Sequence, residues 1–226
     1  MNEEVDGILL VAHELKAPLA VIRQLAFAFE GAGTKDEQVR TELIRVSERA
    51  IRQVNDLARV RRLEDGLFTM EPVAIREVCD AVSHELSYLL GDDSWNLNVK
   101  YKNKSRLVIA NRDLLYSVVY NFLLNAIHYS DNKMKTEMIV SDKCDRVKIT
   151  VRDYGPTLPI DIWRKVKKGR VDRPTSIAMR PGSSGVGLYI ASKFSEYINA
   201  NIGAVRHHDG TSFYVELMMS NQASLF

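Results

Sequence analysis

Residues 13–19 read His-Glu-Leu-Lys-Ala-Pro-Leu, within a segment whose apolar residues recur at alternating steps of four and three. This spacing is typical of the seam of a helical bundle or coiled coil, and it predicts a helix from about residue 3 to residue 30. His13 lies one position off the seam, so we expect its imidazole to flank the core and stay accessible. A neutral imidazole is a good nucleophile near pH 7, and Glu14 could hold the tautomer that leaves one ring nitrogen free.

A short break at Gly31–Thr34 precedes a second predicted helix, which runs to about Glu64 and ends before Asp65-Gly66. The apolar face of this helix is wide, because a second apolar stripe lies beside the first. Two helices alone cannot bury such a face, whereas two hairpins packed as a four-helix bundle can. The sequence therefore predicts an all-α helical hairpin that forms a homodimer.

The rest of the chain predicts an α+β domain. A helix is expected from Pro72 to about Leu90, a strongly apolar one from Arg112 to Tyr129, and a third beginning near Val186. Residues 156–184 are rich in Lys, Arg, Pro and Gly and are predicted to form a loop. Strands are predicted near residues 97–101, 107–110, 135–141, 146–153, 202–207 and 212–218.

Composition excludes several classes of protein. The 226 residues carry a net charge of +2 and are 46% hydrophobic, which gives no case for nucleic-acid binding. No apolar run approaches the roughly 18 residues that a membrane span needs, so we expect no membrane contact by this segment. Cys79 and Cys144 lack metal or redox spacing, and we expect them to be packing residues in a reducing cytoplasm.

Two amides stand four residues apart on the apolar helix. Asn121 and Asn125 therefore share one helix face, and most of that helix is expected to be buried. Burying amides is costly unless they find partners. Their carbonyl oxygens suit Mg²⁺ shared with phosphates, although the same amides could instead cap a neighbouring loop.

A carboxylate follows the apolar face of the strand predicted at residues 146–153. Val147, Ile149 and Val151 form that face, and Asp153 continues it. A carboxylate at the rim of a core needs a hydrogen-bond donor. The exocyclic amine of adenine is one candidate, and a backbone donor in the turn at Tyr154-Gly155 is the other.

A glycine cluster, Gly182-Ser-Ser-Gly-Val-Gly-Leu188, opens the last predicted helix. Such a cluster presents backbone N–H groups to anions, and the helix dipole adds to the attraction. The preceding loop is rich in Lys and Arg, so it is either a solvated loop or a mobile lid over phosphates.

Taken in this order, these motifs resemble the transmitter core of a sensor histidine kinase, and the resemblance covers essentially all 226 residues. The matched motifs are a phosphoacceptor box at His13–Pro18, an asparagine box at Asn121–Tyr129, glycine boxes at Asp153–Gly155 and Gly182–Leu188, and a closing strand motif at Gly210–Phe213.

The resemblance implies two domains: residues 1–66 for dimerisation and histidine phosphotransfer, and residues 67–226 for ATP binding, with the fold of gyrase, heat-shock chaperone and histidine kinase ATPases. His13 would take the γ-phosphate of ATP, Glu14 would accept its proton, and an aspartate of a response regulator would receive the phosphoryl group. The implied cofactors are ATP and Mg²⁺, with Asn121 and Asn125 placing the metal. The implied ATP-binding residues are Asn121, Asn125, His128, Tyr129, Asp153, Gly155, Gly182, Gly185, Val186, Gly187, Leu188 and Thr211.

The resemblance also implies a cytoplasmic location, either alone or as the cytoplasmic part of a larger, membrane-anchored kinase. Three positions depart from the family pattern. His128 replaces a lysine, Thr157 replaces a second glycine, and Ala17 replaces the polar residue that orients water for dephosphorylation of the regulator, which predicts weak phosphatase activity. The departures at His128 and Thr157 leave an alternative, a dimeric phosphotransfer scaffold with a degenerate ATP site.

Overall fold

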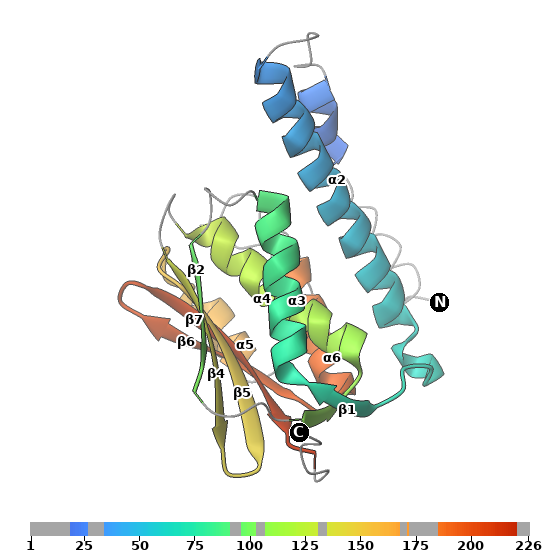
Figure 1. Ribbon diagram of the computed structural model, residues 1–226, viewed down its shortest axis with the longest axis vertical. Coiled ribbons are helices and arrows are strands. Elements are labelled where there is room, and N and C mark those ends of the chain that lie inside the picture. Colours follow the sequence, from blue (N-terminus) through green and yellow to red (C-terminus); the bar gives the residue numbers. More distant parts are fainter. Residues whose placement is uncertain are drawn as a thin grey trace. The chain divides into compact units, whose positions relative to one another are not determined.

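Figure 1 shows a computed structural model that describes residues 19–26, 34–90, 96–102, 107–130, 135–167, 171 and 185–220. Contacts between Cα atoms divide the chain into two compact units, Met1–Arg61 and Arg62–Phe226. The predicted site residues His13, Glu14 and Gly182 lie outside the described residues, as does Ala17. No helix in the described part of the chain is long and apolar enough to span a lipid bilayer.

The first unit is helical where the structure describes it. Residues 19–26 form helix, and α2 covers Thr34–Arg61. Arg59 and Arg61 lie in the last turn of α2, where positive charge interacts favourably with the helix dipole. The helix ends three residues before the predicted Glu64. Apolar side chains of this unit remain exposed, among them Ile44 and Ile51, which lie two helical turns apart.

The second unit begins with a 3₁₀ turn, η1, at Leu63–Asp65. Gly66 then adopts φ +65° and donates its N–H to the Leu63 carbonyl at 3.2 Å, so the predicted stop at Asp65-Gly66 is where helical structure ends. A two-stranded antiparallel sheet follows from β1 (Glu71–Ala74) and β3 (Leu107–Ala110).

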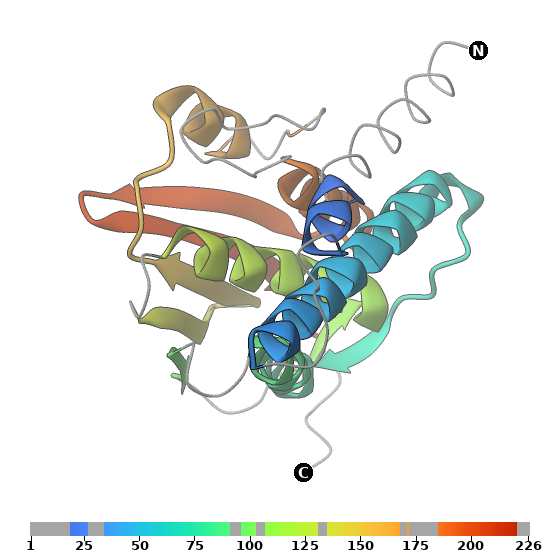
Figure 2. The same ribbon diagram turned by 90° about the horizontal axis from the view of Figure 1, so that it is seen from above.

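The main sheet of the second unit has five strands in the order β2-β4-β5-β7-β6. Only β2 and β4 are parallel, and the other neighbours are antiparallel. Helices cover one face, as Figures 1 and 2 show for α4 and α6. The strands are β2 (Leu97–Tyr101), β4 (Thr136–Lys143), β5 (Arg146–Asp153), β6 (Asn201–His207) and β7 (Gly210–Met218). The helices are α3 (Ile75–Leu90), α4 (Arg112–Tyr129), α5 (Ile160–Lys167) and α6 (Val186–Tyr197).

The core lies between α4 and the sheet. α4 begins at the predicted residue because Asn111 caps it, its side chain accepting from the Leu114 N–H at 3.1 Å. Phe122 of α4 stacks on Phe213 of β7, with ring centroids 5.7 Å apart. Burial alternates along β5, so Val151 and then Asp153 point into the covered face, as the sequence predicted.

Two predictions of secondary structure are wrong, one on where a helix begins and one on a segment expected to be a loop. Pro72 does not open a helix: it lies in β1, opposite Ile109 of β3, and the helix begins at Ile75. A proline without an N–H is tolerated in such a strand, because no strand in the described part of the chain pairs with the other side of β1. The predicted loop at residues 156–184 also contains a helix, α5, whose Ile162 and Val166 are buried one turn apart.

The two cysteines differ in environment. Cys79 of α3 is buried, and burial raises the pKa of its thiol to about 12. Cys144 is exposed in the turn between β4 and β5, where it adopts φ +55°. The prediction that both are packing residues is therefore correct for Cys79 and wrong for Cys144.

Candidate functional site

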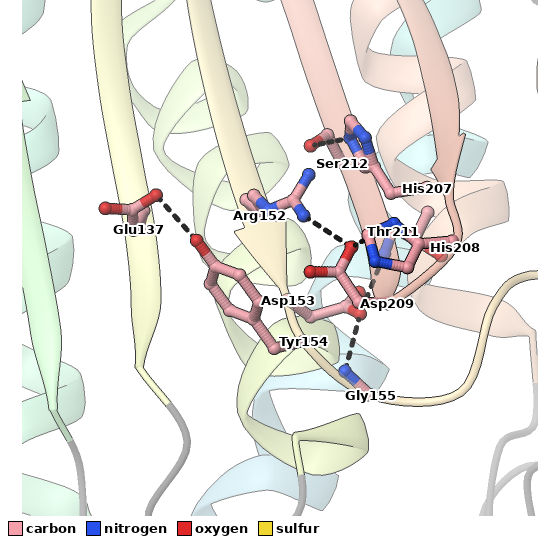
Figure 3. Close-up of polar contacts among 10 residues, drawn as sticks. All are labelled: Glu137, Arg152, Asp153, Tyr154, Gly155, His207, His208, Asp209, Thr211 and Ser212. Carbon is pink, nitrogen blue, oxygen red and sulfur yellow. Dashed lines mark hydrogen bonds and ion pairs between the residues drawn. The ribbon is translucent and has the colours of Figure 1, made fainter.

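Asp153 ends β5 and is the centre of the candidate site. Its side chain is only 1% exposed, and Oδ1 accepts two backbone hydrogen bonds, from Gly155 N at 3.2 Å and from Thr211 N at 3.0 Å (Figure 3). Two N–H donors offset part of the cost of burying a carboxylate. The turn donor considered in the sequence analysis is therefore present, and the strand pairing of Asp153 with Thr211 supplies a second one.

Thr211 is fully buried on β7 beside Asp153. Its hydroxyl accepts from the Leu158 N–H at 3.1 Å, so the segment that follows Gly155 is tied to the same strand. The structure thus brings together three residues that the sequence singled out separately, Asp153, Gly155 and Thr211.

Gly155 joins this group to the end of α4. A Cβ atom at Gly155 would lie 1.7 Å from the Tyr129 carbonyl oxygen, so only glycine allows the two backbones to approach this closely. Tyr129 is the last residue of α4, so the C-terminal end of this helix, whose last two turns carry Asn125 and His128, lies next to the Asp153 turn.

Gly210 also belongs to this site, although the sequence analysis named it only as the start of the closing strand motif and not among the implied ATP-binding residues. It adopts φ +149°, and a Cβ atom there would lie 2.1 Å from the Asp153 carbonyl oxygen. The position therefore requires glycine for both its conformation and its packing. Its place directly before Thr211 in the closing strand motif was the signal that could have identified it.

Asn121 and Asn125 lie on α4 with different partners. Asn121 is buried, and its Nδ2 donates to the Ser117 carbonyl at 2.8 Å. A Cβ atom at Gly187 would lie 2.8 Å from Asn121 Oδ1, so the first turn of α6 packs directly on this amide. Asn125 Nδ2 is buried and has no hydrogen-bond partner among the described residues, which makes it a candidate ligand contact.

α6 begins with the described part of the second glycine box. Gly185 caps the helix at φ +75° and has no side chain that could accept from the first N–H groups. Val186 and Leu188 are buried and fix the helix on the core, while Gly187 contacts Asn121. This helix end can present its N–H groups to an anion.

His128 and Tyr129 complete the predicted set on α4. The two rings meet edge to face, with centroids 5.3 Å apart, and His128 is exposed. Asn121, Asn125, His128 and Tyr129 thus share the helix that contacts both Gly155 and Gly187. Every predicted ATP-binding residue within the described part of the chain lies on α4, at the end of β5 or in the turn after it, at the start of α6, or on β7.

Behind Asp153, on the opposite face of the sheet, lies a cluster that the sequence analysis missed. The Tyr154 hydroxyl donates to Glu137 Oε2 at 2.9 Å, while Lys100 and Lys135 each contact Glu137 Oε1, at 3.1 and 3.2 Å. The hydrogen bond from Lys100, with those from Tyr154 and Lys135, outweighs the effect of burial and lowers the pKa of Glu137 to about 2. No motif marks these residues, because they meet only through the register of β2, β4 and β5.

Glu137→Gln is expected to make the stability of the domain less sensitive to acid. The pKa of Glu137 lies below its ordinary value of 4.5, so its stabilising contribution is present above about pH 4.5 and is lost as the pH falls toward 2. Urea unfolding of the wild type and the variant at pH 7, 4.5 and 3 measures this loss. The wild type should lose more stability than the variant between pH 4.5 and 3.

The matched control for this prediction is Glu216→Gln, which removes the same charge from an ion pair with Lys148 elsewhere in the sheet. Its acid sensitivity should stay close to that of the wild type. Equal acid sensitivity in Glu137→Gln and the wild type would contradict the prediction.

A family model and individual relatives both relate this chain to histidine kinases. Residues 110–221 match the family described as "Histidine kinase-, DNA gyrase B-, and HSP90-like ATPase". The chain is 24% identical over 224 residues to histidine protein kinase SaeS of Staphylococcus aureus strain Newman, covering 96% of this chain and 64% of SaeS. It is 26% identical over 227 residues to sensor protein kinase WalK of Staphylococcus aureus, covering 96% of this chain and 54% of WalK.

Solved structures show the same fold. Histidine kinase AdeS of Acinetobacter baumannii matches with a TM-score of 0.65 and 18% identity, over 92% of this chain and 98% of AdeS. The mycobacterial sensor histidine kinase MprB matches with a TM-score of 0.58 and 20% identity, over 68% of this chain and all of that chain.

These matches confirm the predicted α+β ATP-binding fold for the second unit. They agree with the order of motifs along the chain and with the way the structure gathers the motifs around Asp153. The chain spans 64% or less of the two curated relatives compared above. Residues 110–221 carry a histidine kinase-, DNA gyrase B-, and HSP90-like ATPase domain, and 96% of the chain is similar to the two sensor histidine kinases compared above.

Proposed function

We propose that this chain is an ATP-dependent protein histidine kinase that autophosphorylates His13 and passes the phosphoryl group to an aspartate of a response regulator. The observation that carries the proposal is the buried Asp153 carboxylate, held by the backbone N–H groups of Gly155 and Thr211 within an ATPase domain. Residues 1–66 would form the dimerisation and phosphotransfer domain, and residues 67–226 the catalytic domain.

Asp153 would recognise the base of ATP. A carboxylate accepts a hydrogen bond from the exocyclic amine of adenine. The hydrogen bonds from the Gly155 and Thr211 N–H groups fix the orientation of the Asp153 carboxylate. The connected α4 and α6 would hold the phosphates, because the first turn of α6 beginning at Gly185 offers N–H groups to anions. His128 would supply a phosphate contact in the place where the family carries lysine.

The donor set also fits Mg²⁺. Asn121 and Asn125 would hold the metal through their amide oxygens, which are ligands that Mg²⁺ accepts alongside phosphate oxygens. The Nδ2 atom of Asn125 is buried and has no hydrogen-bond partner among the described residues, and a 180° rotation of the amide would place its oxygen there. The bound ion would neutralise charge on the triphosphate during transfer.

In the proposed reaction, a ring nitrogen of His13 attacks the γ-phosphorus in line. The new N–P bond forms as the bond to the β,γ-bridging oxygen breaks, and ADP leaves with that electron pair. Glu14 accepts the proton from the other ring nitrogen. The chain's contribution is chiefly to position His13 and to stabilise the imidazolium that develops.

We also propose that the helical unit forms the homodimer. The exposed Ile44 and Ile51 of α2 supply apolar surface that a second hairpin would cover. A receiver domain of a response regulator would then approach phosphorylated His13 on this bundle. We expect both steps to take place in the cytoplasm.

Incubation with [γ-³²P]ATP and Mg²⁺ tests the proposed function. Wild-type protein should acquire acid-labile, alkali-stable label, and His13→Ala should acquire none, because a phosphorylated imidazole hydrolyses in acid. His84→Ala is the matched control, since His84-Glu85-Leu86 repeats the first three letters of the phosphoacceptor box. It should label like the wild type.

Label that persists in His13→Ala would contradict the assignment of the phosphoacceptor. A folded dimer that acquires no label and binds no ATP would favour the alternative, a phosphotransfer scaffold with a degenerate ATP site.

A further inference from the structure

The residues on either side of Asp153 point to the opposite face of the sheet. Because side chains alternate along a strand, Arg152 and Tyr154 lie on the face that α4 does not cover, while Asp153 lies on the covered face (Figure 3). Each of these two neighbours is fixed there by a carboxylate from another strand or turn.

Tyr154 is held by β4. Its hydroxyl donates to Glu137 Oε2 at 2.9 Å, and Glu137 is itself buried and paired with Lys100 and Lys135. A hydrogen bond to a charged acceptor is stronger than a neutral one. Since Tyr154 lies directly between Asp153 and Gly155, this bond fixes the turn whose Gly155 N–H holds the Asp153 carboxylate.

Arg152 is held by the turn between β6 and β7. Its guanidinium forms an ion pair with Asp209 Oδ1 at 2.8 Å and lies over the Tyr154 ring, 4.6 Å from the ring centroid. Asp209 stands two residues before Thr211, whose N–H is the second donor to Asp153. We call Glu137, Arg152, Tyr154 and Asp209 the outer clamp.

We infer that the outer clamp positions the Asp153 carboxylate and thereby sets the preference of the site for adenine over guanine. This inference rests on the proposed function, because it requires that Asp153 face the base of a bound nucleotide. Each half of the clamp fixes one of the two backbone donors that hold Asp153 Oδ1. The four clamp residues are positioning residues, which act on the nucleotide only through Asp153.

The chemical basis is the difference between the two bases at C6. Adenine presents an amine there, which donates a hydrogen bond to a carboxylate. Guanine presents a carbonyl oxygen, which a carboxylate repels. Discrimination of this kind depends on a polar group that cannot move to relieve the mismatch. A carboxylate with a loosened turn can shift away, which weakens the adenine contact and reduces the penalty for guanine.

Tyr154→Phe tests the inference by removing only the hydroxyl that donates a hydrogen bond to Glu137. Affinities for ADP and GDP, which avoid phosphotransfer, are measured on the full chain by competition against a fluorescent ADP analogue. We expect ADP binding to weaken about fivefold and GDP binding to stay constant or strengthen, so that the ADP-to-GDP preference falls at least that much.

Tyr101→Phe is the matched control. It also removes a hydrogen bond from a tyrosine to a carboxylate, that of Asp80, in the same unit. Tyr101 is the last residue of β2 and pairs with Val140, whereas Glu137 pairs with Asn98 near the start of that strand. A purely structural role of such bonds would move the unfolding midpoint of both variants and leave both nucleotide preferences unchanged. The inference requires the preference to fall in Tyr154→Phe alone.

Variants of Glu137 test the same hydrogen bond by changing its acceptor instead of its donor. Glu137→Gln keeps an oxygen for the Tyr154 hydroxyl and should keep most of the preference, whereas Glu137→Ala should reproduce the loss in Tyr154→Phe. The double variant Tyr154→Phe/Glu137→Ala should be no worse than either single change, since both break one interaction.

The inference is overturned if Tyr154→Phe and Glu137→Ala retain the wild-type preference, or if Tyr101→Phe loses as much. Failure of the proposed function has a different signature, namely a folded wild-type chain that binds neither nucleotide.

Discussion

Asp153→Asn is expected to weaken adenine nucleotide binding about a hundredfold, because it would replace the acceptor that we propose faces the adenine amine by a donor and would remove the charge. The asparagine oxygen can still accept from Gly155 and Thr211, which should preserve the turn. Isothermal titration with ADP measures the affinity, and urea unfolding shows that the domain remains folded. The same change should improve the affinity for GDP relative to ADP, since an amide N–H can donate to the guanine carbonyl.

Asp80→Asn is the matched control for this prediction. It removes the same charge from a carboxylate that also accepts a hydrogen bond, from Tyr101, away from the candidate site. Nucleotide affinity should remain at the wild-type level. An Asp153→Asn variant that binds ADP as tightly as the wild type would contradict the role of Asp153 in recognising the base.

Gly155→Ala is expected to destabilise the ATPase domain by about 3 kcal/mol, near the upper end of the usual cost of overpacking. The added Cβ would lie 1.7 Å from the Tyr129 carbonyl oxygen, and both groups are backbone, so neither can rotate away. The end of α4 and the Asp153 turn must therefore separate. We expect a fall in the thermal midpoint of about 10 °C, together with loss of nucleotide binding.

Gly203→Ala offers a comparison within the same sheet. A Cβ atom there would lie 2.3 Å from the Tyr214 hydroxyl, which is the end of a side chain that can move. Its thermal midpoint should fall less, and its nucleotide affinity should stay unchanged. If Gly155→Ala matches the wild type in both measurements, the close backbone contact between Gly155 and Tyr129 does not hold the site together.

The parts of the fold that could be predicted from sequence are those with a strong local period. β5 alternates cleanly between buried and half-buried residues, and α4 is apolar on nearly every side, so both were predicted with the observed bounds. Asp153 was singled out for the same reason, because it continues the apolar face of β5.

The missed features depend on contacts between distant parts of the chain. β1 is only four residues long, and its Pro72 is acceptable because of the position of β1 in the two-stranded sheet, which no local pattern reveals. α5 is only eight residues long, and its Trp163 side chain donates to the Ala204 carbonyl of β6 at 2.9 Å. Local propensity is a weak guide where tertiary contacts decide the structure.

In the candidate site, too, residues marked by a local motif could be predicted, whereas residues brought together by strand pairing could not. Residues within motifs, such as Thr211 and Gly187, were proposed because those motifs resemble the motifs of sensor histidine kinases. Glu137 and Tyr154 were not, since their hydrogen bond follows from the antiparallel register that places Glu137 opposite Arg152. Cross-strand neighbours of this kind become visible only when the pairing of strands is known.

The contrast between the two cysteines has a practical use. The Cys79 thiol is buried with a raised pKa and should resist alkylation, while Cys144 lies exposed in the β4–β5 turn, at the opposite end of β5 from Asp153. A maleimide fluorophore should therefore attach to Cys144 alone in the native protein. The chain thus carries its own single labelling position, from which distances to a dye-bearing nucleotide could be followed without introducing or removing any residue.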